Sequence, residues 1–193
     1  DISGKFSLAP GSPPRTSAKF LVQHFDLGGF LKETGLNDEV RSVIDIAADL
    51  SGRGDSVRSL MAELNGSIGA VMGEGYLTKY LDLISVDLSQ KVIPFWGIHK
   101  EARQINCGVI QFDIEKGMAI SRAFVFDSAI AILNARGKID LGTEKVDFLL
   151  IPKPKRPSLT DLTTNLRVSG TLMAPKVRPD AMSLATKGAK LLS

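Results

Sequence analysis

The sequence predicts an α+β protein that is mainly antiparallel β, with a long curved sheet or β-groove and a few short helices packed on the sheet or at its ends. Two observations support this fold class. Residues 105–180 consist of short runs of alternating apolar and polar or small residues, and glycines separate the runs. Most of the connections are only two to four residues long, and strands do not alternate with helices as they do in βαβ folds.

Periodicity places the elements in chain order. Apolar residues that alternate with polar ones indicate strands, and apolar residues three or four apart indicate helices. In the first half we expect strands over 2–10, 19–27, 40–50 and 67–72, and helices over 30–34 and 57–64. In the second half we expect a helix from Thr78, a helix from Pro179, and strands over 105–114, 118–126, 129–133, 137–142, 146–151 and 166–172.

The helix over 57–64 has clear end signals. Asp55 or Ser56 can accept hydrogen bonds from the free amides of its first turn. Asn65 and Gly66 both tolerate the left-handed backbone that ends a helix.

Size and composition bound the architecture. The 193 residues, 44% hydrophobic and 23% charged, predict a single globular domain over 1–193. No stretch approaches the roughly 18 apolar residues that a membrane span requires. The chain begins at Asp1 rather than Met, so we expect a fragment of a longer chain whose signal or anchor lies outside it.

Charge is concentrated near the C-terminal end. The net charge is +3, yet residues 151–193 contain eight Lys or Arg against two Asp. A basic end can meet anionic lipid or nucleic acid, or can be a solvated surface. It contains no aromatic residue for base stacking, so we expect no nucleic-acid partner.

The chemistry of catalysis and metal binding is scarce. The two histidines, His24 and His99, lack a serine elbow, and no metal-ligand spacing occurs. Cys107 lies within an expected strand, where a small buried thiol is more typical than a nucleophile. We therefore expect no catalytic residues, no metal and no cofactor.

Apolar residues occur on both sides of several expected strands, which is unusual for a sheet with one face in water. In one explanation, helices such as 57–64 cover the second face and β-bulges correct the alternation. In the other, one face lines a groove for acyl chains. The candidate lining residues each fall on the even side of their strand: Ile120, Phe124, Phe126, Ile130, Ile132, Phe148 and Leu150.

Several short sequence motifs resemble those of the AsmA-like proteins of the bacterial envelope. They occur in the same order as in that family and extend over about two-thirds of the chain. They are residues 49–56 with their Gly-x-Gly turn, 60–68 with Leu-Asn-Gly, the strand pair in 105–117, residues 137–141, and 169–175 with Ser-Gly-Thr-Leu and Pro175. The resemblance implies a periplasmic segment tethered to the inner membrane by an N-terminal helix absent here. It also implies a part in outer-membrane biogenesis and a β-groove like that of chorein-type lipid carriers, without catalytic residues.

Two functions from different classes follow. The first is a non-enzymatic envelope module that binds or guides a phospholipid or other acyl-chain lipid along the sheet. The second is a structural scaffold with a sealed sheet that binds an envelope protein. A separate prediction concerns the C-terminal helix. Its apolar side either packs on the sheet or contacts an anionic membrane surface. That apolar side consists of Ala181, Leu184, Ala185, Gly188, Leu191 and Leu192.

Overall fold

The computed structural model describes residues 1–35, 41–76, 104–129, 131–155 and 164–181. Several expectations lie outside these residues. They are the helix from Thr78, the histidine His99, the candidate lining residue Ile130 and the C-terminal helix beyond residue 181.

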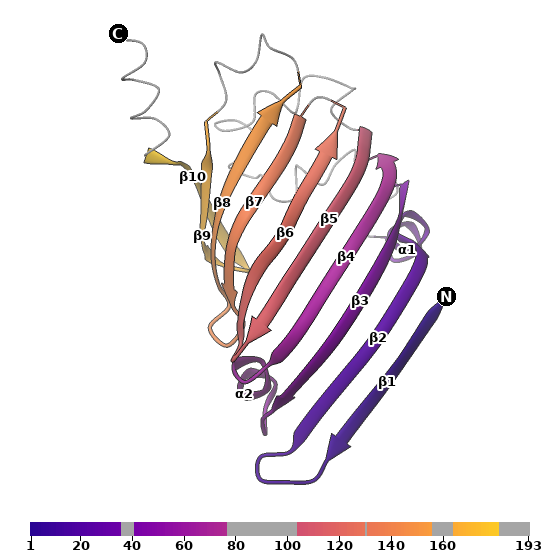
Figure 1. The fold of residues 1–193 in the computed structure, drawn as a ribbon, viewed down its shortest axis with the longest axis vertical. Coiled ribbons are helices and arrows are strands. Elements are labelled where there is room, and N and C mark those ends of the chain that lie inside the picture. Colours follow the sequence, from indigo (N-terminus) through magenta and orange to yellow (C-terminus); the bar gives the residue numbers. More distant parts are fainter. Residues whose placement is uncertain (36–40, 77–103, 130, 156–163, 182–193) are drawn as a thin grey trace.

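The described strands form one ten-stranded antiparallel sheet in which every strand pairs with its neighbours in sequence (Figure 1). The sheet is open and curved, so that β9 and β10 turn away from the plane of the first strands. The strands are β1 Ile2–Ala9, β2 Arg15–Asp26, β3 Arg41–Arg53, β4 Asn65–Tyr76, β5 Gln104–Glu115, β6 Met118–Ser128, β7 Ala131–Asp140, β8 Lys145–Pro154, β9 Leu166–Thr171 and β10 Ala174–Pro179. The expected fold class, a curved antiparallel sheet with a few short helices, is confirmed.

Two short helices lie at opposite ends of the strands (Figure 1). Helix α1, Leu27–Glu33, begins where the Asp26 carboxylate accepts a hydrogen bond from the amide of Gly29. Helix α2, Val57–Ala62, begins at Ser56, whose side chain accepts from the Ser59 amide while Ser59 Oγ accepts from the Ser56 amide. Ser56, rather than Asp55, is therefore the capping residue.

The register of the strands separates the sheet into two faces. Residues directly opposite each other in an antiparallel pair point to the same side. One such row runs through Ile2, Val22, Ile46, Ala70, Ile110 and Phe124. We call this side the apolar face; across the sheet it also presents Phe6, Phe20, Ala48, Ile68, Phe112, Ala119, Leu133, Ala135, Ile139, Val146, Phe148, Leu150, Val168 and Val177.

The opposite side, which we call the polar face, presents most of the charged strand residues. Cross-strand ion pairs join Lys19 to Asp49 at 2.7 Å and Arg167 to Asp147 at 2.8 Å. The Asp49 carboxylate raises the pKa of the Lys19 amine, first through their hydrogen bond and then through its charge. Because these side chains are largely exposed, such pairs contribute little stability.

Most strands end within a few residues of the expected positions, and two segments differ by more than that. The segments 129–133 and 137–142 are parts of one strand, β7, because its polar residues Asn134, Arg136 and Lys138 all lie on the polar face. Strand β10 lies in a segment for which we expected no strand, and it contains Pro175 and Pro179, which a central strand would not tolerate. They are tolerated because β10 is the last strand of the sheet and pairs only with β9.

Candidate functional site: the apolar face of the sheet

Four of the candidate lining residues share the apolar face. Phe124 and Phe126 lie opposite Ile110 and Gly108 of β5. Phe148 and Leu150 of β8 lie on the same face, because they are directly opposite Gly137 and Ala135 of β7, which are on that face. The register therefore brings these four residues together on one surface.

Ile120 and Ile132 lie on the polar face instead. Ile120 is opposite Asp113 and Lys138, and Ile132 is opposite Asp127 and Lys153. An even residue number does not predict the face here, for two reasons. A bulge between β5 and β6 shifts the alternation of faces after Gln111. The length of each turn also decides separately whether the even or the odd residues of the next strand lie on the apolar face. The expectation of bulges is thus correct, but these two residues cannot line the same surface as Phe124.

Large rings span the apolar face between β5 and β8. The ring of Phe148 lies 6.1 Å from that of Phe112 and 6.1 Å from that of Phe124, measured between centroids. Three strand spacings separate β5 from β8, or about 14 Å in a flat sheet. The ring of Phe148 also covers Gly137, where an added Cβ would lie 2.8 Å from it. This contact between distant strands indicates that the apolar face is the inner side of the curve.

Helix α2 closes one end of the apolar face. Buried Leu64, just after the helix, clusters with Ile114 and Ala119, and Met61 packs against the same cluster. The turn between β5 and β6 approaches α2 so closely that a Cβ on Gly117 would meet the carbonyl oxygens of Met61 and Ala62 at 2.6–2.7 Å. The helix therefore packs on the end of the apolar face, and does not cover the polar face as one explanation of the sequence pattern required.

The apolar face is uncovered, among the described residues, toward β1. Ile2, Phe6 and Leu8 are 74%, 70% and 63% exposed, and Ile110 in the middle of β5 is also exposed. A hollow of about 820 Å³ crosses the middles of β1–β5. Its lining includes apolar-face residues such as Ile46, Ile68 and Ala70, together with polar-face residues. The apolar face is thus filled by side chains around Phe148, half-buried over most of β2–β4, and largely exposed at β1. We call the less filled part, β1–β4, the open floor.

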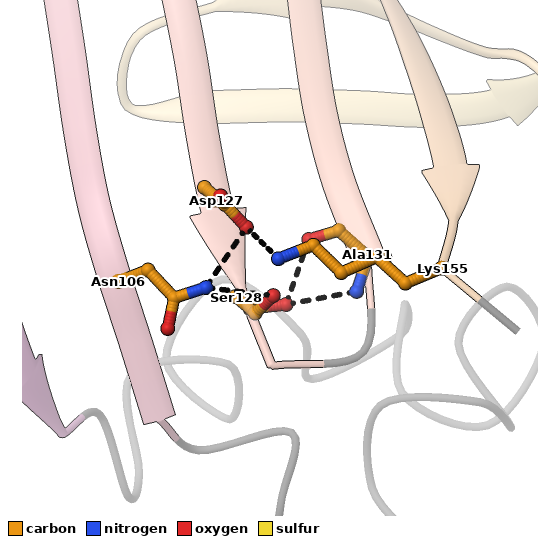
Figure 2. Close-up of polar contacts among 5 residues, drawn as sticks. All are labelled: Asn106, Asp127, Ser128, Ala131 and Lys155. Carbon is orange, nitrogen blue, oxygen red and sulfur yellow. Dashed lines mark hydrogen bonds and ion pairs between the residues drawn. The ribbon is translucent and has the colours of Figure 1, made fainter.

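A polar cluster, unexpected from the sequence, fixes the end of the sheet opposite α2 (Figure 2). Ser128, fully buried, donates from Oγ to the carbonyl of Ala131 at 2.9 Å and accepts from its amide. Asn106 donates to Asp127 at 3.2 Å, and Asp127 pairs with Lys155 at 2.5 Å. These bonds join β5, β6, β7 and the end of β8, so the cluster has a structural role. No sequence signal reveals it, because Asn106 and Lys155 lie far along the chain from Asp127 and Ser128.

Among the described residues, the reactive side chains of His24 and Cys107 lie on separate strands, β2 and β5. His24 lies exposed at a bulge in β2, where its backbone amide donates to Asp45 at 2.6 Å. Cys107 is exposed and not buried as expected, because it pairs with Asp127 on the polar face. Within the part of the chain that the structure describes, no three His, Cys, Asp or Glu residues are placed to hold a metal. No helix in that part is long and apolar enough to cross a membrane.

Comparison with known proteins agrees with the motifs in the sequence. The chain is 24% identical over 198 residues to the AsmA family protein YhjG of Escherichia coli, and the match covers 96% of this chain. The chain is AsmA-like. It spans only 29% of the length of this relative. No protein-family model matches the chain. No solved structure matches it.

Proposed function

We propose that the chain is a non-enzymatic envelope module that binds or guides lipid acyl chains along the apolar face of its sheet. It would work in the periplasm, within a longer protein anchored in the inner membrane, in outer-membrane biogenesis or phospholipid transport. The observation that carries the proposal is the continuity of the apolar face. Its cross-strand rows contain no charged side chain from β1 to β8.

Acyl chains suit such a surface for a physical reason. Exposed apolar area on this scale is unfavourable in water, and an apolar chain laid along it removes that area from water without needing a hydrogen bond. The open floor at β1–β4 offers the contact surface. The cluster of Leu64, Ile114 and Ala119 beneath α2 closes one end of it.

Positions on the two faces of the sheet provide a matched test. Ala70 and Ile110 are directly opposite each other on the apolar face. Val125 of β6 and Ile151 of β8 are both opposite Asn134 on the polar face and lie outside the hollow. We expect Ala70→Asp with Ile110→Asp to lower retained lipid by about tenfold or more, because a carboxylate in an acyl-chain site is costly to desolvate. Val125→Asp with Ile151→Asp introduces the same two charges on the polar face, outside the hollow, and should leave lipid retention unchanged.

Native mass spectrometry of the purified proteins and uptake of a fluorescent phospholipid measure the effect, with circular dichroism as a check of folding. Equal lipid retention by both double variants would contradict the proposal. A wild-type protein that carries no lipid and takes up none would favour a second function.

That second function is a scaffold whose sheet is sealed and whose surface binds an envelope protein. The packing of Phe112, Phe124 and Phe148 favours it for β5–β8, because their rings fill the apolar face there. It does not account for the exposed Ile2, Phe6 and Leu8 of β1.

A further inference from the structure

Charge is unevenly distributed between the two halves of the sheet. Strands β1–β5 contain five basic and six acidic residues, whereas β7–β10 contain seven basic and two acidic residues. The register places all nine charged residues of β7–β10 on the polar face. The basic members are Arg136, Lys138, Lys145, Lys153, Arg167, Lys176 and Arg178.

Three arginines lie in a single row across these strands. Arg136 is opposite Leu149, Leu149 is opposite Arg167, and Arg167 is opposite Arg178. Like charges directly opposite each other in an antiparallel pair are destabilising. Arg167 pairs with Asp147, but the described residues include no recorded ion pair for Arg136 or Arg178. Only Arg167 and Arg178 oppose each other directly, and this placement of two like charges points to a role other than folding.

The row borders a hollow on the polar face. The hollow has a volume of about 770 Å³, and Arg136, Lys138 and Arg167 line it together with the carboxylates of Asp147 and Asp180. Ile120 and Leu149 add apolar area to the same lining. Arg136, Lys138, Arg167, Lys176 and Arg178 are all exposed.

We propose that the polar face of β7–β10 docks on the surface of an anionic phospholipid bilayer. Exposed basic side chains attract anionic lipid headgroups by their summed charge, without a fixed partner for each side chain. The basic residues here fit that mode, since they repeat over four strands. An acidic protein would instead need carboxylates in matching positions, and a single phosphate would use only a few of them. Ile120 and Leu149 supply apolar contact at the headgroup level.

This docking surface is separate from the acyl-chain site. The residues that carry it point away from the apolar face, so substitutions on one face leave the other unchanged. A protein with Ala70→Asp and Ile110→Asp should still bind vesicles, and failure of the lipid-guiding function would therefore leave this inference standing.

The test removes four exposed basic residues that form no recorded ion pair among the described residues: Arg136→Gln, Lys138→Gln, Lys176→Gln and Arg178→Gln. Co-sedimentation is measured with vesicles of phosphatidylcholine containing roughly one-third phosphatidylglycerol. Each basic side chain near such a surface contributes about fivefold to binding, so we expect the quadruple variant to bind about a hundredfold or more weakly. Its thermal stability should be unchanged or higher, because Arg178 no longer opposes Arg167.

A matched control removes the same charge elsewhere, by Lys5→Gln, Arg15→Gln, Arg41→Gln and Arg58→Gln. These residues are exposed and lie in β1, β2, β3 and α2. The control should bind vesicles within about threefold of the wild type, because its charges lie outside the docking surface. An equal loss in both variants would overturn the inference, since net charge alone would then explain the binding.

Two competition experiments separate the other sources of negative charge. Millimolar inorganic phosphate should leave vesicle binding nearly unchanged. If phosphate instead displaces the protein from the vesicles, the basic residues form a discrete anion site and the inference is overturned. Binding to polyglutamate but not to anionic vesicles would mean an acidic protein partner and would also overturn the inference.

Discussion

Strands β1–β4 and strands β5–β8 carry apolar side chains on the same face, but those side chains meet different neighbours in the two regions. In β5–β8, Phe112, Phe124 and Phe148 meet above the small residues of β7. In β1 the apolar side chains Ile2, Phe6 and Leu8 remain largely exposed. The hydrophobic pattern is alike in both regions, yet one forms a core and the other an open floor.

Side-chain size explains the difference. Rings can reach across a curved sheet only where the strand between them carries small residues, as β7 does at Ala135 and Gly137. The apolar face of β2–β4 has small residues as well, such as Ala48 and Ala70, but few rings to lie over them. Alternation of apolar residues thus predicts a face, whereas the distribution of large and small residues decides whether that face closes on itself.

The largest expected effect tests this difference directly. Phe148 is buried and contacts Phe112 and Phe124, so Phe148→Ala should lower the free energy of unfolding by about 3–5 kcal/mol. Phe6 in β1 is 70% exposed, and Phe6→Ala should lower it by less than about 1 kcal/mol. Urea denaturation followed by circular dichroism measures both values. Similar losses in the two variants would show that the open floor at β1 is in fact covered in solution.

The order of the strands could be predicted from the sequence, because alternation, glycine turns and short connections are local signals. The face of each strand could not. Ile120 and Ile132 were placed with Phe124 by their even numbers, but the bulge after Gln111 and the separate parity of β7 put them on the polar face. Side-chain direction depends on register, which is set by partners distant in sequence.

The same limit applies to individual residues of the site. Cys107 was expected to be buried because it lies among apolar residues of one strand, and pairing with Asp127 exposes it. The row of Arg136, Arg167 and Arg178 is invisible in the sequence, because its members lie on three different strands. By contrast, the N-terminal cap of α2 at Ser56 could be predicted as one of two candidates, because a cap depends only on residues that are neighbours in the sequence.

A smaller effect concerns the end of the apolar face that α2 closes. Ser56→Ala removes the hydroxyl that accepts from the Ser59 amide at 3.2 Å, and should lower the free energy of unfolding by about 1 kcal/mol. Ser51→Ala, at an exposed position in β3, is the control and should change it by less than about 0.5 kcal/mol. An unchanged stability for Ser56→Ala would mean that packing of Leu64 and Met61 alone holds α2 in place.

The smallest expected effect lies in the turn between β7 and β8, at the packed half of the sheet. The Asp140 carboxylate accepts hydrogen bonds from the amides of Gly142 and Thr143, both at 3.0 Å. Hydrogen bonds from Thr143 are the main reason that the pKa of Asp140 lies below its ordinary value of 3.8. A carboxyl whose pKa is lower in the folded state stabilises the fold at pH values above its pKa in the unfolded state. This contribution is lost as the pH falls through the pKa of the folded state.

Asp140→Ala should therefore lower the urea midpoint slightly at neutral pH, and the difference from the wild type should shrink as the pH falls below 3.8. Glu115→Ala removes an exposed carboxylate from the end of β5 and serves as the control. A pH-independent difference for Asp140→Ala would contradict this role of the carboxylate, because it would show that the turn does not depend on the ionised form.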